Sequence, residues 1–367
     1  MKKIAQTLCI AAVAIAMAAC GGNKQYTITG SVADDQFDGA MVYLYNNGEV
    51  VDSANISNGH FTLRGTVEQP WVGMVYTHSE SARAMLDFIV EPGQIKLDLL
   101  DDHVGGTPLN DSLQLFLTAN DNSDLDAQLK GYLQLYYTAP SAEVRAQAEH
   151  LYDSVEAIGT DRTFALANKM YDGNRDNVLG AYALGVLCGT DRLTYAMLEE
   201  KLADAAQVVK DYKPVADKLA QLRAIEQTSV GKHYTDIEGV DGRLSDLVEG
   251  HVALVDFYAS WCGPCRAEIR DNIVPLWAKY KDKGLVVVGL NVWERGDAAA
   301  RKAAHEKVMA DLGITYPQLV DSTRTATDTY GVQGIPQIIL IGADGTILAR
   351  DLRGAAIEES IVNALGK

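Results

Sequence analysis

The motif Trp261-Cys262-Gly263-Pro264-Cys265 directly follows the apolar run Val252–Tyr258, and this junction restricts the fold more than any other feature. A short apolar run before a Gly-Pro pair predicts a buried strand that turns at once into a helix. Cysteines separated by two residues at a helix start lie close enough to form a disulfide without backbone movement. The unpaired N–H groups and the positive dipole of the helix start favour a thiolate on the first cysteine. The junction therefore predicts a redox-active dithiol.

The residues of the motif have separate physical roles. Gly263 permits a tight approach, and Pro264 suits the first helical turn because no N–H partner is needed there. Cys262 is the predicted nucleophile because it lies nearer the helix end and solvent. Cys265, one helical turn further on and more buried, is predicted to attack Cys262 and so resolve the mixed disulfide.

The whole chain is long and acidic. Its 367 residues exceed what one compact core usually holds and predict two or three domains. A net charge of −17 argues against nucleic-acid binding and indicates a soluble, self-repelling surface.

Residues 1–19 have the features of a signal peptide rather than of a fold. Lys2 and Lys3 precede an apolar stretch, Leu8–Ala19, that is too short to span a bilayer. Its end, Met17-Ala18-Ala19-Cys20-Gly21-Gly22, resembles a bacterial lipoprotein cleavage box. That resemblance implies cleavage before Cys20, lipidation of Cys20, and anchoring on a membrane with the protein facing the periplasm. The alternative is an ordinary secretory signal whose small residues happen to end in a cysteine.

Cysteine usage indicates chemistry rather than structural cross-links. Cys9 leaves with the signal and Cys20 would carry lipid, which leaves Cys188, Cys262 and Cys265. An exported protein with so few cysteines does not depend on a disulfide framework. Cys188 lies in an apolar run and is interpreted as a buried small side chain, with a third redox thiol as the alternative.

Residues 20–105 have a short, alternating apolar pattern interrupted by turn residues such as Asn46-Asn47-Gly48. This pattern predicts a small antiparallel β-domain, either a sandwich or an open barrel. The predicted strands are Tyr26–Gly30, Met41–Tyr45, His60–Gly65, Trp71–Thr77 and Ile95–Leu99. Val90-Glu91-Pro92-Gly93, with Gly106–Asn110 downstream, resembles a β-rich domain found in bacterial envelope lipoproteins.

Residues 106–230 change to helical spacing, as in Leu113, Phe116 and Leu117. The spacing predicts several amphipathic helices whose aromatic stripes belong to a core. The predicted breaks between helices are Pro140, Gly159-Thr160-Asp161, Gly173 and Gly189.

Residues 231–367 alternate strands with helices after a polar, turn-rich entry. This order predicts a mixed sheet covered by helices on both faces. Asp344-Gly345 predicts a hairpin between the last two strands. After the cysteine-containing helix, the predicted elements are strand Leu285–Val292, helix Ala298–Leu312, a helical turn at Thr323–Tyr330, strands Gln337–Ile341 and Thr346–Arg350, and helix Ile357–Leu365.

Two segments of this last domain carry a family resemblance, namely Val255–Arg266, which contains the cysteines, and Tyr330–Pro336. They resemble the thioredoxin superfamily, and within it the lipid-anchored or membrane-tethered (TlpA/ResA-like) oxidoreductases of the bacterial envelope. The resemblance covers Lys232–Lys367 and implies an α/β thioredoxin fold with thiol–disulfide oxidoreductase activity at a Cys262–Cys265 disulfide. Because no second CxxC or HxxxH follows, neither a metal nor another cofactor is expected.

Asp256 stands out because it is a carboxylate inside an otherwise apolar strand. Burial of such a group costs on the order of several kcal/mol unless it is paired or protonated. The resemblance implies a catalytic role, in which Asp256 lies beneath the cysteines and exchanges a proton with the resolving thiol. The alternative is an aspartate at a sheet edge that reaches solvent.

The resemblance also implies a substrate-binding surface around the dithiol. Pro336 matches the cis-proline of the family, which leaves the preceding backbone free to pair with a substrate strand. For Trp261, a plain core tryptophan is the competing interpretation. The residues expected to contact substrate are Trp261, Gly263, Pro264, Ile335 and Pro336.

The residues around the cysteines favour the reducing direction. The Gly-Pro pair, Ile335 and Asp256 all resemble the reductases of the superfamily. Potentials in the superfamily run from about −270 mV for thioredoxin to about −120 mV for the strongest oxidant, so modest changes can reverse the role. The expected partners are oxidised envelope proteins as substrates and a membrane dithiol as electron donor.

Other functions stay open on the sequence alone. One alternative is a disulfide isomerase or oxidase, and an isomerase usually needs a homodimer, which the N-terminal domain could provide. A second alternative, from another class, is a non-catalytic module that binds copper or an apocytochrome through the two thiolates.

Overall fold

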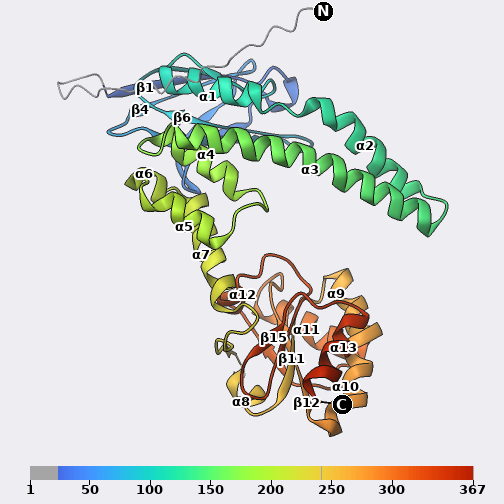
Figure 1. Cartoon of the computed structure of the whole chain (residues 1–367). Coiled ribbons are helices and arrows are strands. Elements are labelled where there is room, and N and C mark those ends of the chain that lie inside the picture. Colours follow the sequence, from blue (N-terminus) through green and yellow to red (C-terminus); the bar gives the residue numbers. More distant parts are fainter. Residues whose placement is uncertain (1–23, 241, 367) are drawn as a thin grey trace, which may run out of the picture. The chain divides into compact units, whose positions relative to one another are not determined.

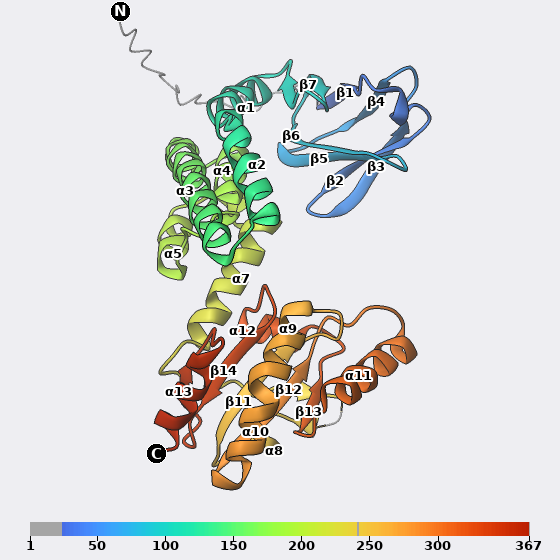
Figure 2. The same cartoon turned by 90° about the vertical axis from the view of Figure 1, so that its right-hand side faces the viewer.

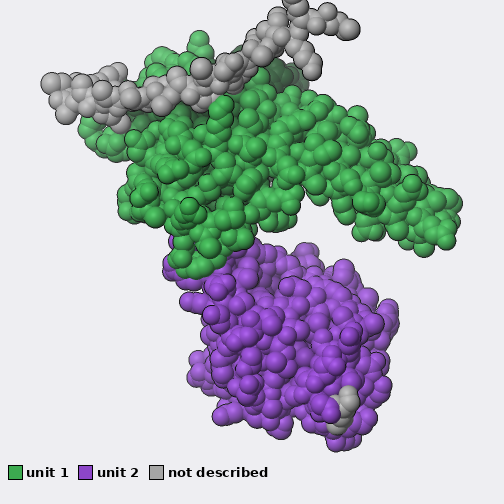
Figure 3. All heavy atoms as spheres, in the orientation of Figure 1, with its two compact units in different colours: residues 1–218 green, residues 219–367 purple. Residues whose placement is uncertain are grey.

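The structure is a computed structural model that describes residues 24–240 and 242–366 (Figure 1). The chain divides into two compact units, residues 1–218 and residues 219–367 (Figure 3). Helix α7 (Lys213–Gln227) contains the point of division. The predicted signal peptide and Cys20 lie outside the described residues.

The first unit begins with a β-domain of two four-stranded sheets, with strand orders β4-β1-β7-β8 and β3-β2-β5-β6. Alternation along the strands buries one face, as at Ile28 and Leu44. The strands are β1 Gln25–Ser31, β2 Met41–Asn46, β3 Glu49–Asn55, β4 His60–Thr66, β5 Trp71–His78, β6 Arg83–Val90, β7 Gly93–Asp98 and β8 His103–Gly105. A short 3₁₀ turn covers Asp35–Phe37. The predicted β-rich domain is confirmed.

One strand pair differs from the antiparallel prediction, because β1 and β7 run parallel, with Ile28 opposite Ile95. The chain reaches β7 by way of the other sheet rather than through a hairpin, so these two strands are free to run in the same direction. Strands β3, β6 and β8 were absent from the prediction. Of these, β3 has no buried residue and therefore lacks the apolar alternation that marks a strand.

Helices follow the β-domain, and they end close to most of the predicted breaks. Their bounds are α1 Pro108–Ala119, α2 Ser123–Thr138, α3 Ala142–Asp172, α4 Val178–Cys188, α5 Tyr195–Ala203 and α6 Gln207–Lys210. The predicted break at Gly159-Thr160-Asp161 is wrong, because α3 continues through it. A Cβ atom on Gly159 would lie 3.4 Å from a methyl group of Leu125 on α2, an ordinary van der Waals contact. A single glycine costs a helix only about 1 kcal/mol, so a long packed helix can continue through it.

The apolar and aromatic stripe predicted on α2, Leu129, Tyr132, Leu133 and Tyr136, is not fully buried core. Leu129, Tyr132 and Tyr136 are half-buried and Leu133 is exposed, and Leu125 is the one buried residue among those described on α2. Within the described chain, α2 packs chiefly against α3. Helical periodicity identifies the apolar side of a helix but does not say whether a second element covers it.

The second unit is built on a five-stranded mixed sheet with order β13-β12-β11-β14-β15 (Figure 2). The central strand β11 pairs in parallel with β12 and antiparallel with β14. The strands are β11 Val252–Tyr258, β12 Leu285–Asn291, β13 Gln318–Val320, β14 Gln337–Ile341 and β15 Ile347–Ala349. A two-stranded ribbon, β9 Glu238–Gly239 with β10 Gly242–Arg243, lies in the entry segment. The predicted mixed sheet and its final hairpin are confirmed, and β13 was absent from the prediction.

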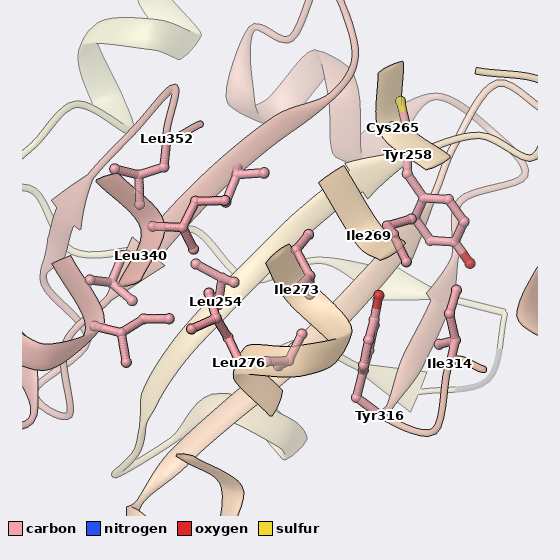
Figure 4. Close-up of a cluster of buried hydrophobic side chains, with 14 of the residues drawn as sticks. Leu254, Tyr258, Cys265, Ile269, Ile273, Leu276, Ile314, Tyr316, Leu340 and Leu352 are labelled. Carbon is pink, nitrogen blue, oxygen red and sulfur yellow. The ribbon is translucent and has the colours of Figure 1, made fainter. Parts of the chain in front are cut away.

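Helices cover both faces of this sheet, as predicted. One face packs against α9 (Gly263–Glu268), α10 (Val274–Tyr280) and α13 (Ala355–Ala364), and Figure 4 shows Ile269, Ile273 and Leu276 of this layer over Leu254 and Leu340. The other face packs against α8 (Ser245–Val248) and α12 (Thr325–Tyr330). Helix α11 (Ala298–Leu312) lies between β12 and β13 in the chain and contributes Val308 to the first layer.

Pro275 alters the hydrogen-bonding pattern of the helix that begins at the dithiol, but the helix continues past it. Between α9 and α10 the residues Ile269–Ile273 form a wider, π-helical turn. A proline has no N–H to donate to the carbonyl one turn earlier, and a wider turn is a common way to accommodate this. The helical path therefore continues from Gly263 to Tyr280 with its register shifted.

Candidate active site

The two cysteines are joined by a disulfide at the beginning of α9, four residues after the end of β11 at Tyr258. Cys262 is the residue that caps the helix, and its Sγ accepts a hydrogen bond from the backbone N–H of Cys265 at 3.2 Å. Their Cα atoms are 5.3 Å apart. Cys262 is 4% exposed and Cys265 is fully buried, so a partner can reach only Cys262. No atom lies within 4 Å of where a Cβ on Gly263 would stand, which leaves the approach beside Cys262 open.

The loop before β14 faces the disulfide. The peptide bond between Ile335 and Pro336 is cis, as the family resemblance implied. The Sγ of Cys262 lies 3.7 Å from the carbonyl oxygen of Ile335. The guanidinium group of Arg353 donates a hydrogen bond to the carbonyl of Pro336 and another to that of Leu352. Residues 335 and 336, far from the cysteines in sequence, are thus brought against Cys262 by the pairing of β14 with β11.

Trp261 stands beside the dithiol and is 43% exposed, so it is not the core residue of the competing interpretation. Its indole N–H donates a hydrogen bond to the carbonyl of Trp293 at 3.0 Å. The guanidinium of Arg295 lies 4.2 Å from the centre of its ring, within the range of a cation–π contact. An exposed aromatic surface held in this way is suited to contact with a substrate chain.

Glu294 was not identified from the sequence, although it organises the loop that leads into the cysteines. One carboxylate oxygen accepts the backbone N–H of Ser260 at 2.6 Å, and the other accepts its hydroxyl at 2.7 Å. The side-chain amide of Asn291 donates to the same carboxylate at 2.8 Å. Glu294 and Ser260 are 34 residues apart, so no local sequence pattern indicates this contact. Glu294 is a positioning residue, because it holds the loop and does not touch the sulfur atoms.

Replacing Glu294 with glutamine should lower the rate of disulfide exchange by about tenfold, since a charge-assisted pair of hydrogen bonds to Ser260 is lost. The pH profile of thiol alkylation at Cys262 should shift as well, because the loop that positions this thiol relaxes. Glu359→Gln, an exposed change of the same kind on α13, is the matched control. An unchanged rate and pH profile in the Glu294 variant would refute the positioning role.

Asp256 is fully buried, and neither of its carboxylate oxygens has a hydrogen-bond partner among the described residues. The pKa of Asp256 is raised to about 8, mainly by burial; the guanidinium of Arg353 offsets part of this rise, and the carboxylate of Glu268 adds to it. The interpretation of Asp256 as a sheet-edge residue is wrong, because β11 is the central strand with neighbours on both sides. A carboxyl group with a pKa near neutrality can both accept and return a proton.

Cys188 is buried at the end of α4, in the first unit. Burial raises the pKa of its thiol to about 12. A thiol with so high a pKa is almost entirely protonated at neutral pH and is a poor nucleophile. The interpretation of Cys188 as a buried small side chain is confirmed.

Among the described residues, none of the helices has both the length and the apolar character needed to cross a membrane.

The two units match different protein families. Residues 225–350 match the AhpC/TSA family, and residues 26–113 match a domain of unknown function (DUF4369). The chain is 29% identical over 147 residues to the thiol-disulfide oxidoreductase ResA of Bacillus thuringiensis (strain Al Hakam), covering 39% of this chain and 80% of that protein. It is 34% identical over 124 residues to the thiol:disulfide interchange protein CycY of Rhizobium leguminosarum bv. viciae, covering 33% of this chain and 61% of that protein.

One solved structure among the similar ones is a thiol:disulfide interchange protein DsbE from Chlorobium tepidum. It is 33% identical, and the match covers 38% of this chain and 99% of that chain with a TM-score of 0.33.

Proposed function

We propose that this chain, whose C-terminal domain is a thiol–disulfide oxidoreductase domain of the thioredoxin superfamily, reduces disulfides in other proteins outside the cytosol. The observation that carries the proposal is the arrangement of the Cys262–Cys265 disulfide. It lies at a helix start, with its accessible sulfur against the carbonyl of Ile335 and an exposed Trp261 alongside. This arrangement offers a client both an attacking sulfur and a free backbone edge for strand pairing.

In the proposed reaction, the reduced enzyme transfers two electrons to the client. The thiolate of Cys262 attacks one sulfur of the client disulfide, the client S–S bond breaks, and the released client thiolate takes a proton. Cys265 then gives its proton to the carboxylate of Asp256 and attacks the Sγ of Cys262. The mixed disulfide breaks, the second client sulfur leaves as a thiolate that takes a proton from solvent, and the Cys262–Cys265 disulfide forms.

The state of Asp256 supports this sequence of steps. A pKa of about 8 means that a fraction of the enzyme carries the carboxylate near neutral pH, ready to accept the proton of Cys265. Once the disulfide has closed, the protonated carboxyl can return that proton to solvent. In the following cycle a dithiol donor must reduce the enzyme again, since the reaction consumes its two electrons.

The N-terminal residues support a location outside the cytosol. Lys2, Lys3 and the apolar stretch Leu8–Ala19 are typical of an export signal, and Cys20 follows at the position where bacterial lipoproteins are lipidated. We therefore place the protein on the periplasmic face of a bacterial membrane, held by a lipid on Cys20. A dithiol donor in the same membrane would then supply electrons, and oxidised envelope proteins would be the clients.

Turnover of insulin tests the proposal. The purified chain beginning after Cys20 should reduce insulin with dithiothreitol as donor, and the Cys188→Ser variant should do so equally well. Equilibration with glutathione should give a potential more negative than about −200 mV, nearer to thioredoxin than to the strong oxidants near −120 mV. Absence of turnover would refute the oxidoreductase function, and a potential near that of the oxidants would refute the reducing direction.

A further inference from the structure

A cavity of about 450 Å³ lies in the second unit, between the last turns of α7 and the cis-proline loop, residues 331–336. Gln221 and Ile225 form its wall on α7, and the loop forms another part of the wall. The rest comes from the segment that follows β15. Both residues of α7 belong to the second unit, which begins at Leu219. The cavity therefore lies beside the loop that faces the disulfide.

Close packing holds the end of α7 against this loop. A Cβ atom on Gly331 would lie 2.5 Å from the side chain of Ile225 and 2.8 Å from a backbone atom of α7, so a side chain there would push α7 away. The φ of Gly331 is +63°, which favours glycine for a second reason. The guanidinium of Arg350 donates to the carbonyl of Thr228, just after α7, at 2.7 Å and to that of Tyr330 at 2.8 Å. The position of α7 beside the cis-proline loop is therefore fixed within the second unit.

The cavity is continuous with the surface that faces a client. Ile335 and Pro336 belong to its wall, and the Sγ of Cys262 lies 3.7 Å from the carbonyl oxygen of Ile335. No atom lies within 4 Å of where a Cβ on Gly334 would stand, so the path along the loop is open. A client strand that pairs with this backbone edge while its disulfide meets Cys262 has to continue along the loop on one side of the disulfide. That path leads to the cavity.

The charged groups of the wall have partners within the protein. Arg350 donates to the two carbonyls that hold α7, and Arg353 donates to the carbonyls of Leu352 and Pro336. Asp351 is exposed, and its charge acts on the neighbouring guanidinium of Arg350. The wall therefore offers little uncompensated charge to an incoming side chain.

Accessible apolar surface comes from both α7 and the cis-proline loop. Ile225 and Ile335 are half-buried, so part of each side chain is open to the cavity or to solvent, and Val332 is buried in the same wall. An apolar side chain that enters the cavity would cover this surface and would itself leave water, and both changes are favourable. The occupant that fits is therefore an apolar side chain carried by an extended client chain.

We propose that α7 completes a client subsite, in which the cavity between Gln221, Ile225 and the cis-proline loop holds an apolar side chain of the client next to its reacting cysteine. The proposal rests on the proposed function, because it names what a client of the dithiol presents. Helix α7 precedes residues 231–367, the domain to which the sequence assigns the dithiol. The choice of client therefore depends on a segment outside that domain.

Two disulfide-closed peptides test the subsite. They share one Cys-Gly-Gly-Cys ring, and one carries a leucine on each side of the ring where the other carries an asparagine, which is similar in size but polar. The pre-reduced protein should react with the leucine peptide with a second-order rate constant about fivefold higher, because its side chain leaves water in the cavity. The ratio of the two rate constants measures the preference, and a general change in the reactivity of the dithiol cancels in this ratio.

Two variants of α7 should reduce the preference for the leucine peptide to less than about twofold. Gln221→Trp fills the cavity, so the client side chain has no room. Ile225→Thr keeps a branched side chain but replaces apolar surface with a hydroxyl group. If Gln221→Trp does not fold, the smaller change at Ile225 decides the test.

Each variant has a matched control that should keep the full preference. Gln227→Trp is the same change on the same helix, at an exposed residue that is not part of the cavity wall. Val230→Thr is the control for Ile225→Thr, because Val230 is 59% exposed and also lies outside the wall.

Three results would overturn the subsite. These are a reaction of the asparagine peptide as fast as that of the leucine peptide or faster, an undiminished preference in the variants of Gln221 and Ile225, and an equal loss of preference in the two controls. Insulin separates this proposal from the proposed function. If insulin is reduced but the peptides are not distinguished, only the subsite fails, and if insulin is not reduced, the function fails.

Discussion

Replacing Cys262 with serine should abolish disulfide reduction, with the rate falling by roughly 10³-fold or more. A serine hydroxyl is not ionised at neutral pH and cannot form a mixed disulfide, so both steps of the reaction are lost. Cys262 is assigned as the attacking residue because it is the accessible member of the pair, while Cys265 is fully buried. Insulin turnover with dithiothreitol measures the loss.

The Cys265→Ser variant should behave differently, because the first attack survives and only the resolving step is lost. In cells, this variant should accumulate covalent complexes with oxidised clients, visible on non-reducing gels and separable with a reductant. Cys262→Ser should capture none, and Cys188→Ser should resemble the wild type because its buried thiol takes no part. Complexes with Cys262→Ser but not with Cys265→Ser would reverse the assignment of the two cysteines.

Replacing Asp256 with asparagine should stabilise the protein, and most strongly in alkaline solution. The pKa of Asp256 is about 8 in the folded protein, mainly because of burial, against about 3.9 for an unfolded chain. Between these values the folded state binds a proton that the unfolded state has released, so the free energy of unfolding falls as pH rises. Above pH 8 the cost of the buried carboxylate is fully present, on the order of 5 to 6 kcal/mol at about 1.4 kcal/mol for each pKa unit.

Urea unfolding of the oxidised protein at pH 5 and pH 9 measures this effect. The stabilisation by Asp256→Asn should be several-fold larger at pH 9 than at pH 5. Asp282→Asn, an exposed change with the same chemistry, should give a small difference that is equal at the two pH values. Equal stabilisation by Asp256→Asn at both values would show that its carboxyl does not titrate in this range.

The same variant should slow catalysis, because the resolving thiol loses its proton acceptor. Removal of a general base typically lowers a rate by about 10² or more at neutral pH. The mixed disulfide should accumulate in Asp256→Asn as it does, more completely, in Cys265→Ser. A protein that becomes more stable and less active through one change would be the signature of a buried carboxyl kept for proton transfer.

Much of the second unit could be predicted from the sequence because its signals are local. The strand Val252–Tyr258 has seven consecutive buried residues, and apolar runs of this kind are typical of a central strand. Helix Ala298–Leu312 and strand Gln337–Ile341 have the predicted bounds in the structure. Local periodicity and turn residues determine such elements before any tertiary contact forms.

Elements without a clear apolar side, and pairings between strands distant in the sequence, were harder to predict. The exposed edge strand β3 carries no apolar alternation, and the apolar stripe of α2 is only half-buried although its spacing predicted core. The parallel pairing of β1 with β7 depends on the path of the chain through a second sheet. For β1 and β7 the deciding contact lies many residues away, where no local pattern can report it. Strand β3 pairs with the adjacent β2, and it was missed because no buried residue marks it.

The sequence by itself determined the chemistry of this protein, because a dithiol needs only two cysteines at the correct spacing on a helix start. It also indicated that Asp256 is unusual, since a carboxylate in an apolar strand is unusual wherever it lies. Only the tertiary structure decided how that chemistry is supported. Asp256 is buried on the central strand β11, between β12 and β14, and this burial raises its pKa. Folding also places Glu294 in contact with Ser260, which is 34 residues away in the sequence. Solvent exclusion and long-range contacts belong to the folded chain as a whole, so they have no counterpart in any short stretch of sequence.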